Sequence, residues 1–444
     1  MKTTVCILGA GAGGIGCAYR LIKSGVKVVM IDKNPDLGGT MTFGGIDGFE
    51  PGVSLDGIHT LIKDELLRME NGAHVVEVIP NLHLLDGEVD FDWEKHSFKE
   101  RPWGYDYPVG GSYEDTLARC NIVRGDRPQR RFQFDGDLFI KAVRSIFAPY
   151  KENLTELYGY KYLSCEKENG KITAINVGCG EETVRIDAEV FVDCSGDIVL
   201  ARDAGCEFAY GTEGFEDYQE PSAGERSDTV NAVTYAFRVT GAKDSNHIDP
   251  LPDDVSETDL GEWERVAMKR VVSLIVRYPD GDLHVNMLPT MQGDEYLQLG
   301  SDADRIGRAR VLKYWHFLQS EKGLKGYTVK RIYDAGIRES YRLVGKYVLR
   351  EQDLRSGILG QPKKGRTVAI ADHNMDIHGK GGFNAALDLP YEIPIECCMT
   401  KEFDNLFVAC RGASFTHIAG SSARLSRTML SMGEGVGEYI KEIL

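Results

Sequence analysis

The first 33 residues decide the fold, and their opening stretch, residues 3–14, reads TTVCILGAGAGG. Its apolar, β-branched first half predicts a buried strand, and GAGAGG fits the G-x-G-x-x-G pattern of a dinucleotide-binding turn. The amphipathic stretch 15–24 predicts a helix that Gly25 ends, and 26–31 predicts a second strand closed by Asp32. The segment therefore predicts a βαβ unit.

The residues of this unit have distinct mechanical roles. Gly9 permits a tight turn, Gly11 lets the backbone approach a pyrophosphate, and Gly14 lets the helix pack closely on the strand. The helix N-terminus then faces the phosphates, and the Asp32 carboxylate can accept a hydrogen bond from a ribose hydroxyl. The cofactor-binding residues expected here are Gly9, Gly11, Ala12, Gly13, Gly14, Asp32 and Lys33.

A second glycine-rich turn, LGGT at residues 37–40, favours FAD over NAD. An extended FAD would meet the chain again here, near its ribitol and pyrophosphate, whereas a nicotinamide dehydrogenase needs no such turn. A plain glycine-rich connection is the alternative. Gly39, Thr40 and Met41 join the expected cofactor-binding residues. No second G-x-G-x-x-G follows a later strand, so a nicotinamide cofactor would dock only transiently.

The composition is that of a globular protein and argues against several classes. The 444 residues suffice for two or three domains, and 42% are hydrophobic and 27% charged. A net charge of −16 argues against nucleic acid as a partner. No apolar run reaches the ~18 residues that span a bilayer. Ten cysteines that form no disulfide framework predict a cytoplasmic protein.

Further elements are predicted along the chain. A helix over 138–147 follows Asp135, and strands at 154–163 and 172–177 flank the hairpin signal Asn169-Gly170. The other expected features are a buried strand at 190–193, helical spacing over 334–352, a helix over 427–440 interrupted by glycines, and a solvated or interdomain basic run at Arg124, Arg127, Arg130 and Arg131.

Three later segments carry a family resemblance when they are taken with the two glycine turns. They are DCSGD at 193–197, GIRE at 336–339, and residues 405–437. In these segments the chain resembles soluble FAD-dependent oxidoreductases that are distantly related to fumarate reductase flavoproteins. The resemblance implies a glutathione-reductase-like FAD domain of α/β, Rossmann type, built from discontinuous segments, with a second α+β substrate domain above the flavin.

The implied boundaries place residues 1–45, 133–212 and 390–444 in the FAD-binding domain, and 46–132 and 213–389 in the substrate domain. The chain departs from the family pattern at two places. Cys410 replaces a glycine before the arginine of the last strand. Thr40 and Met41 follow the second glycine turn without a histidine, so we expect non-covalent FAD.

The resemblance also suggests cofactor contacts outside the first unit. Thr428 and Met429 occupy the first turn of the last helix, whose backbone N–H groups would stabilise negative charge on the flavin pyrimidine. Tyr162 could meet the adenine, although a packed strand residue is the alternative. The remaining expected contacts are Ser195, Gly196 and Arg411.

Four residues are candidates for catalysis. His417, in a small-residue loop before the last helix, is the leading acid/base candidate, and a histidine satisfied within its loop is the alternative. His378 is a second candidate with the same alternative. Arg424 could bind a substrate carboxylate or the flavin. Arg338 would share a helix face with Arg342, for anion recognition or for a buried charge network.

These residues predict an FAD-dependent oxidoreductase that transfers a hydride equivalent between flavin N5 and a small polar, oxygen-bearing substrate. The acceptor stays open between O2, NAD(P) and a carrier, and a homo-oligomer is possible. The spacing of His373, Asp376 and His378 is too irregular for a metal site. An electron-carrier subunit and a flavin-dependent RNA-modifying enzyme are the alternatives, although no iron–sulfur cysteine spacing supports a built-in relay.

Overall fold

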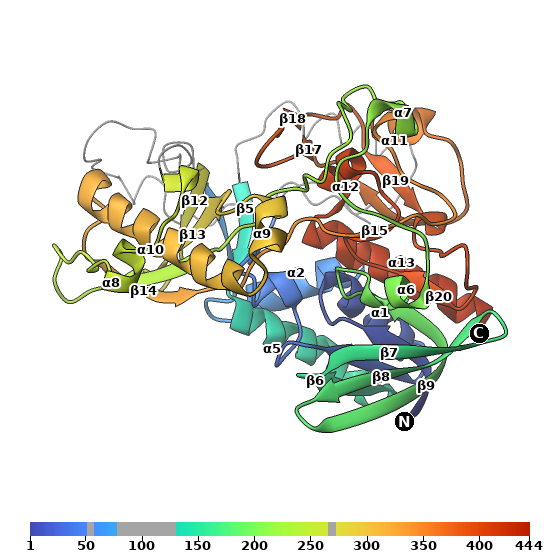
Figure 1. Cartoon of the computed structure of the whole chain (residues 1–444). Coiled ribbons are helices and arrows are strands. Elements are labelled where there is room, and N and C mark those ends of the chain that lie inside the picture. The colour runs from blue at the N-terminus through green and yellow to red at the C-terminus, as the bar shows by residue number, and fades with distance from the viewer. Residues whose placement is uncertain (51–56, 78–129, 265–271) are drawn as a thin grey trace.

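The computed structural model describes residues 1–50, 57–77, 130–264 and 272–444, which form two layered units (Figure 1). Within these ranges the largest sheet has seven strands in the order β6-β2-β1-β9-β8-β7, and β20 also pairs with β9. The strands are β1 (Lys2–Leu8), β2 (Val28–Asp32), β6 (Leu154–Tyr158), β7 (Lys161–Glu168), β8 (Lys171–Cys179), β9 (Glu182–Asp193) and β20 (Leu406–Val408).

The N-terminal βαβ unit is confirmed. β1 and β2 pair in parallel through α1 (Ala12–Lys23), and Gly25 follows the helix with φ of +83°. β1 also pairs in parallel with β9, which pairs in parallel with β20. All five residues of β2 are buried, as expected for a central strand covered on both faces. The carboxyl ends of β1, β9 and β20 therefore lie together at one edge of the sheet.

The last helix, α13 (Ser426–Ile443), packs on α1 through glycines. A Cβ at Gly16 would lie 2.1 Å from the Leu430 carbonyl oxygen, and one at Gly433 would lie 2.0 Å from the Gly13 carbonyl oxygen. The glycines of this helix therefore do not interrupt it. They allow two backbones to touch, which a side chain would prevent.

The second unit is an antiparallel sheet of order β12-β13-β11-β14, covered by the long helix α10 (Ala303–Lys322). Its core is separate from that of the first unit and centres on Phe237, Tyr314 and Trp315. Arg238 ties the units together, because its Nη1 lies 2.7 Å from Oδ2 of Asp135, the residue that caps α5. The strands are β11 (Phe237–Gly241), β12 (Val272–Arg277), β13 (Leu283–Leu288) and β14 (Tyr327–Ile332).

The remaining helices and strands pack around these two sheets. The helices are α2 (Ile58–Arg68), α5 (Gly136–Phe147), α6 (Val199–Ala204), α7 (Phe215–Tyr218), α8 (Asp253–Ser256), α9 (Gly293–Leu299), α11 (Glu351–Gly360) and α12 (His417–Ala423). The strands are β3 (Gly48–Phe49), β4 (Ala73–Glu77), β5 (Arg130–Phe134), β10 (Phe208–Ala209), β15 (Arg342–Leu343), β16 (Thr367–Ala371), β17 (Met375–Asp376), β18 (Asn384–Ala385) and β19 (Tyr391–Pro394). Among the described residues, no helix is both long and apolar enough to cross a membrane.

The division between the two hydrophobic cores differs from the expected domain boundaries. Phe49 and Ile58, expected in the substrate domain, pack in the core of the first unit. Leu349 and Val368 lie in the segment 213–389, which was also expected in the substrate domain, and they pack in this first core together with Tyr391. The boundaries differ because β16 packs against α13, so this segment returns to the first unit before residue 390.

The helix predicted over 334–352 is absent from that described segment, where α11 begins only at Glu351. The backbone bonds to distant partners instead: Gly336 N–H donates to the Thr234 carbonyl (2.7 Å) and Leu343 N–H to the Gly412 carbonyl (2.8 Å). Arg338 and Arg342 therefore do not share a helix face. Of the predicted basic run, Arg124 and Arg127 lie outside the described residues.

The contact between Gly14 and Gly9 leads to a stability prediction. A Cβ at Gly14 would lie 1.9 Å from the Gly9 carbonyl oxygen, whereas a Cβ at Gly11 would meet nothing within 4 Å. We expect Gly14→Ala to lower the free energy of unfolding by about 1–3 kcal/mol through overpacking. Urea unfolding measures it, with Gly11→Ala as the matched control. Equal losses in both variants would contradict this account.

Candidate active site

A cavity of about 930 Å³ lies where the carboxyl ends of β1, β9 and β20 face the second unit. Ligands of open α/β sheets bind outside such strand ends. Sixteen of the residues predicted for the site line it: Gly9, Gly11, Ala12, Gly13, Asp32, Lys33, Gly39, Thr40, Tyr162, Ser195, Gly196, Arg338, His378, Arg411, Arg424 and Met429. The other four, Gly14, Met41, His417 and Thr428, are described but do not line it.

The glycine loop is held against two strand ends. Gly9 has φ of +111°, and a Cβ there would lie 2.3 Å from the Cys194 carbonyl oxygen. A Cβ at Gly13 would lie 1.7 Å from the Ala409 carbonyl oxygen. Gly11, by contrast, borders the cavity with open space at its Cα, which leaves room for a close approach by a ligand.

Asp32 connects the glycine loop to β2. Its Oδ2 accepts a hydrogen bond from the Ala10 N–H (2.7 Å), and its Oδ1 accepts one from the Asn34 N–H (2.8 Å). Burial raises the pKa of Asp32, while these two N–H groups favour the carboxylate. The side chain thus braces the loop and also borders the cavity where a ribose is expected.

The second glycine turn packs directly on the first. The Gly38 N–H donates to the Ala10 carbonyl (2.8 Å), and a Cβ at Gly39 would lie 3.1 Å from Cα of Gly11. Thr40 lines the cavity, whereas Met41 is fully buried beneath the turn. Met41 therefore supports the turn from the core, because the backbone of this short 3₁₀ turn directs its side chain inward.

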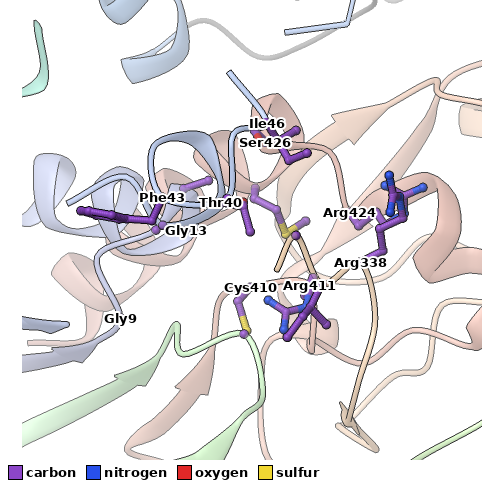
Figure 2. A pocket seen from close by; sticks show the side chains of 18 of the residues that line it. Gly9, Gly13, Thr40, Phe43, Ile46, Arg338, Cys410, Arg411, Arg424 and Ser426 are labelled. Atoms are coloured by element: carbon purple, nitrogen blue, oxygen red, sulfur yellow. The ribbon is translucent and has the colours of Figure 1, made fainter. Parts of the chain in front are cut away.

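The strand ends supply the floor of the cavity. Arg411 Nη2 lies 2.7 Å from Asp197 Oδ1, which also accepts a hydrogen bond from Ser340 Oγ (2.7 Å). Burial opposes ionisation of Asp197, yet Arg411 and Ser340 hold its pKa below the usual range. Gly196 has φ of +83°, and a Cβ there would collide with the Arg411 guanidinium. Figure 2 shows Arg411 beside Cys410 at this side of the pocket.

Tyr162 and Met429, two of the expected cofactor contacts, both lie at the cavity. Tyr162 lines the cavity, and its hydroxyl donates to Asp203 Oδ2 (2.6 Å). Met429 borders the cavity from the first turn of α13, together with Ser426 and Arg427. Thr428 is buried behind them, and its Oγ1 has no hydrogen-bond partner among the described residues. The start of α13 therefore meets the cavity, whereas Thr428 does not line it.

The opposite end of the cavity is polar. His378 Nε2 lies 2.8 Å from Asp376 Oδ2, and both residues line the cavity. Burial lowers the pKa of His378, and the hydrogen bond to Asp376 offsets only part of this. Burial opposes the ionisation of Asp376, but His378 and Arg424 hold its pKa below the usual range. A neutral imidazole oriented by a carboxylate is thus exposed to the cavity.

Asn231 holds this end in place, and sequence reasoning missed it. Its side-chain oxygen accepts from the His378 N–H (3.0 Å), and its amide Nδ2 donates to the Asp376 carbonyl (3.3 Å). Its own N–H donates to Glu339 Oε2 (2.8 Å). Asn286 and Tyr296 of the second unit line the cavity. Like Asn231, they belong to no motif that a single sequence reveals.

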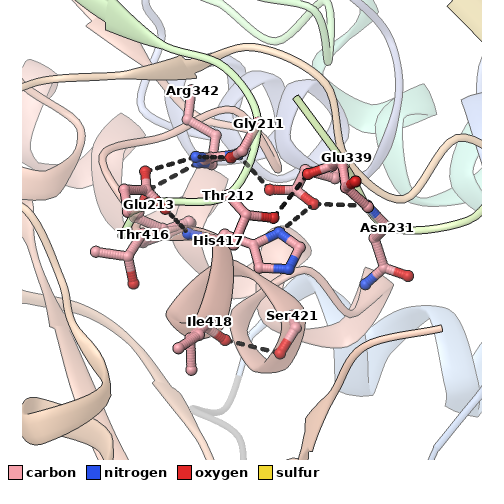
Figure 3. A network of polar contacts seen from close by, with 12 residues as sticks. Gly211, Thr212, Glu213, Asn231, Glu339, Arg342, Thr416, His417, Ile418 and Ser421 are labelled. Atoms are coloured by element: carbon pink, nitrogen blue, oxygen red, sulfur yellow. Dashed lines mark hydrogen bonds and ion pairs between the residues drawn. The ribbon is translucent and has the colours of Figure 1, made fainter. Parts of the chain in front are cut away.

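His417, the leading acid/base candidate from the sequence, lies in a buried ionic network instead of in the cavity (Figure 3). Its Nδ1 is 2.7 Å from Glu339 Oε2, and its N–H donates to Glu213 Oε2 (2.8 Å). Arg342 pairs with both carboxylates and is 1% exposed. The segment 211–213 and the loop 339–342 enclose the imidazole, so tertiary packing separates it from the cavity.

The chain matches a known protein family over nearly its whole length. The family model described as FAD dependent oxidoreductase matches residues 4–441. The glutamate synthase [NADPH] small chain of Halomonas elongata is 55% identical over 40 residues, and that of Escherichia coli K12 is 50% identical over 40 residues. Each match covers 9% of this chain and 8% of the relative, so the chain spans a small fraction of the length of these relatives.

Among solved structures, a geranylgeranyl bacteriochlorophyll reductase-like protein from Thermoplasma acidophilum is 14% identical with a TM-score of 0.48, covering 99% of this chain and 78% of that chain. The flavin-dependent brominase Bmp2 is 12% identical with a TM-score of 0.44, covering 100% and 79%. An aklavinone-11 hydroxylase in complex with FAD and aklavinone is 10% identical with a TM-score of 0.45, covering 99% and 62%.

The buried network around His417 predicts a pH-dependent stability. Burial opposes ionisation of Glu339, but His417 and Arg342 hold its pKa below 4.5. Its contribution is therefore present above the unfolded pKa and is lost as the pH falls through the folded pKa. We expect Glu339→Gln to cost about 3–5 kcal/mol at pH 7, because Arg342 loses a buried partner.

Urea unfolding at pH 7 and in steps below pH 4.5 tests this prediction. The Gln variant should lack part of the acid destabilisation of the wild type. Glu207→Gln is the matched control, since the Glu207 side chain is 59% exposed in its pair with Lys401 and such pairs contribute about 0–1 kcal/mol. A Glu339 variant as stable as the control would contradict the assignment.

Proposed function

Because the chain belongs to the FAD dependent oxidoreductase family, we propose that it transfers a hydride equivalent between flavin N5 and a small polar, oxygen-bearing substrate. One observation carries the proposal. The His378–Asp376 pair and the guanidinium groups of Arg338 and Arg424 border the same cavity as the glycine loop. An acid/base group and oxygen-binding cations therefore adjoin the space in which a bound flavin ring would lie.

The residues of the cavity fit FAD. The open space at Gly11 allows a pyrophosphate to approach the start of α1, whose first N–H groups have no intrahelical partners. Asp32 borders the expected ribose position, and Tyr162 the expected adenine position. The start of α13 meets the cavity further along, where its dipole would stabilise negative charge. The absence of a histidine at Thr40 and Met41 supports non-covalent binding.

We assign proton transfer to His378. Bound FAD supplies a two-electron acceptor or donor at N5. In the oxidation of a substrate alcohol, the neutral His378 imidazole would take up the hydroxyl proton, and the electron pair of the C–H bond would leave to the cofactor held by the cavity residues. A carbonyl group forms, and the imidazolium that results is stabilised by Asp376 at 2.8 Å. The reverse reaction uses the same groups in the opposite order.

The alternatives from the sequence receive less support. An electron-carrier subunit has no need of the half-buried His378–Asp376 pair beside the cavity. The 40-residue similarity to glutamate synthase small chains covers too little of the chain to suggest a partner. A net charge of −16 disfavours RNA as substrate. The electron acceptor, whether O2, NAD(P) or a carrier, and homo-oligomerisation stay predictions.

The first test is anaerobic bleaching of the FAD-loaded protein by hydroxy acids, sugars, alcohols and amines, with the reverse assay on photoreduced protein. We expect His378→Gln to retain FAD and to slow flavin reduction by the best substrate by about 10²- to 10⁴-fold, because the base is lost. His247→Gln, a substitution at a histidine remote from the cavity lining, is the control. An unchanged single-turnover rate in His378→Gln would remove His378 from the mechanism.

The pH dependence gives a second test. Since burial lowers the pKa of His378 below 6.5, we expect the rate of flavin reduction to fall only at pH values below 6.5. Asp376→Asn should move this acid limb to still lower pH, because the Asp376 hydrogen bond and charge raise the His378 pKa. Stopped-flow absorbance measures both profiles. A limb that moves to higher pH in the Asn variant would refute the pairing.

A further inference from the structure

Arg338 and Arg424 lie beside each other at the polar end of the cavity, across from the glycine loop (Figure 2). Arg338 belongs to the irregular segment after β14, and Arg424 is the C-cap of α12. Burial lowers the pKa of Arg338, and the nearby positive charge of Arg424 lowers it further. Two cations brought together at one wall of a cavity require a physical reason.

The hydrogen bonds that the structure gives these groups use few of their donors. A guanidinium has five N–H donors. Arg338 Nη1 donates to the Ala232 carbonyl (2.8 Å), and Arg424 Nη2 donates to the Asp376 carbonyl (3.1 Å). Arg424 Nε is buried with no hydrogen-bond partner among the described residues. The Arg424 side chain is 13% exposed, so bulk water does not readily replace the missing acceptor.

The negative charge nearby is already engaged. Asp376 Oδ2 lies 3.9 Å from Arg424 Nη2 but 2.8 Å from His378 Nε2. Glu339, next to Arg338 in the chain, turns into the buried network of Arg342 and His417. Glu50 also lines the cavity and acts on Arg424 more weakly than Asp376 does. Within the part of the chain that the structure describes, neither guanidinium therefore has a carboxylate at hydrogen-bond distance.

Two other arginines of the same site show the contrast. Arg342 is more deeply buried, and burial opposes its charge, yet its two glutamate partners raise its pKa, whereas burial and Arg424 lower the pKa of Arg338. Arg411, on the floor of the cavity, has Asp197 at 2.7 Å. Among the described residues, the fold thus places carboxylates at hydrogen-bond distance from Arg342 and Arg411 but not from Arg338 and Arg424, and Asp376 Oδ2 lies 3.9 Å from Arg424 Nη2. A largely buried cation with weak pairing is costly, and a bound anion would lower that cost.

We propose that Arg338 and Arg424 together bind a carboxylate group of the substrate, so that the enzyme acts on small organic acids whose reacting carbon lies next to the carboxylate. Planar guanidinium forks match the two oxygens of a carboxylate. His378 is close to both arginines, since both charges affect its ionisation, so the bound carboxylate and the reacting oxygen would be neighbours. The proposal rests on the function proposed above and narrows its substrate class.

The test measures binding to the oxidised, FAD-loaded protein by flavin difference absorbance, without turnover. The probes are glycolate, lactate and malonate, each paired with its amide, together with inorganic phosphate. We expect the carboxylates to bind at least tenfold more tightly than the amides. Arg338→Gln and Arg424→Gln should each weaken carboxylate binding by about tenfold to a hundredfold, the effect of losing a charged hydrogen bond.

Controls separate this result from a general loss of charge or of folding. Arg331→Gln removes the same charge at an exposed position on β14 and should leave binding unchanged. Arg338→Lys and Arg424→Lys keep the charge and serve if a Gln variant fails to fold. They should bind carboxylate more weakly than the wild type because the planar fork is lost. Each variant is compared at equal FAD content.

The outcomes distinguish this proposal from the proposed function. Carboxylate binding that both substitutions weaken supports the anion site even if no compound bleaches the flavin. Bleaching by neutral alcohols and their carboxylate analogues with equal affinity keeps the hydride-transfer proposal and overturns the carboxylate site. Phosphate binding tighter than any carboxylate, or Gln variants that lose FAD while their residual holoprotein binds carboxylate normally, would also overturn it.

Discussion

The structure depends on close backbone contact between the glycine loop and the elements around it. Gly13 lies against the Ala409 carbonyl on one side and against Gly433 of α13 on another, with no room for a Cβ at either contact. This contact joins residues that are about as far apart in the chain as they can be. It brings the start of α1, the end of β20 and the start of α13 to one edge of the sheet, where the cavity lies.

Around that edge, one group of charged residues forms a buried ionic network, and another group lines the cavity. Arg342, Glu339, Glu213 and His417 satisfy one another in the interior, and their ionic bonds hold the loop 339–342 against α12. Asp376 and His378 face the cavity and are positioned by Asn231, whose N–H bonds to the same Glu339 carboxylate. The interior network therefore also sets the position of the polar wall of the site. A change within it would reach the site through Asn231.

Several features could be predicted from the sequence because they depend on local physics. The βαβ unit, the Asn169-Gly170 turn (φ of +50° and +73°) and the helix that follows Asp135 need only neighbouring residues to be specified. The helix predicted over 334–352 was wrong, because Gly336 and Leu343 bond to distant backbone groups that periodicity cannot reveal. Periodicity also predicts that glycines interrupt the last helix, whereas they pack against α1, which lies near the other end of the chain.

The sequence by itself determined the nucleotide loop, the family and the residues from which an active site could be drawn, since glycine spacing and acid placement are local constraints. Only the tertiary structure decided which residues reach the cavity. From the sequence, His417 and His378 are both acid/base candidates, and Arg338 and Arg342 are both candidates for anion recognition or a buried charge network. Long-range packing buries one member of each pair against Glu339 and leaves the other at the cavity wall, because burial and charge pairing depend on neighbours that the chain supplies from distant positions.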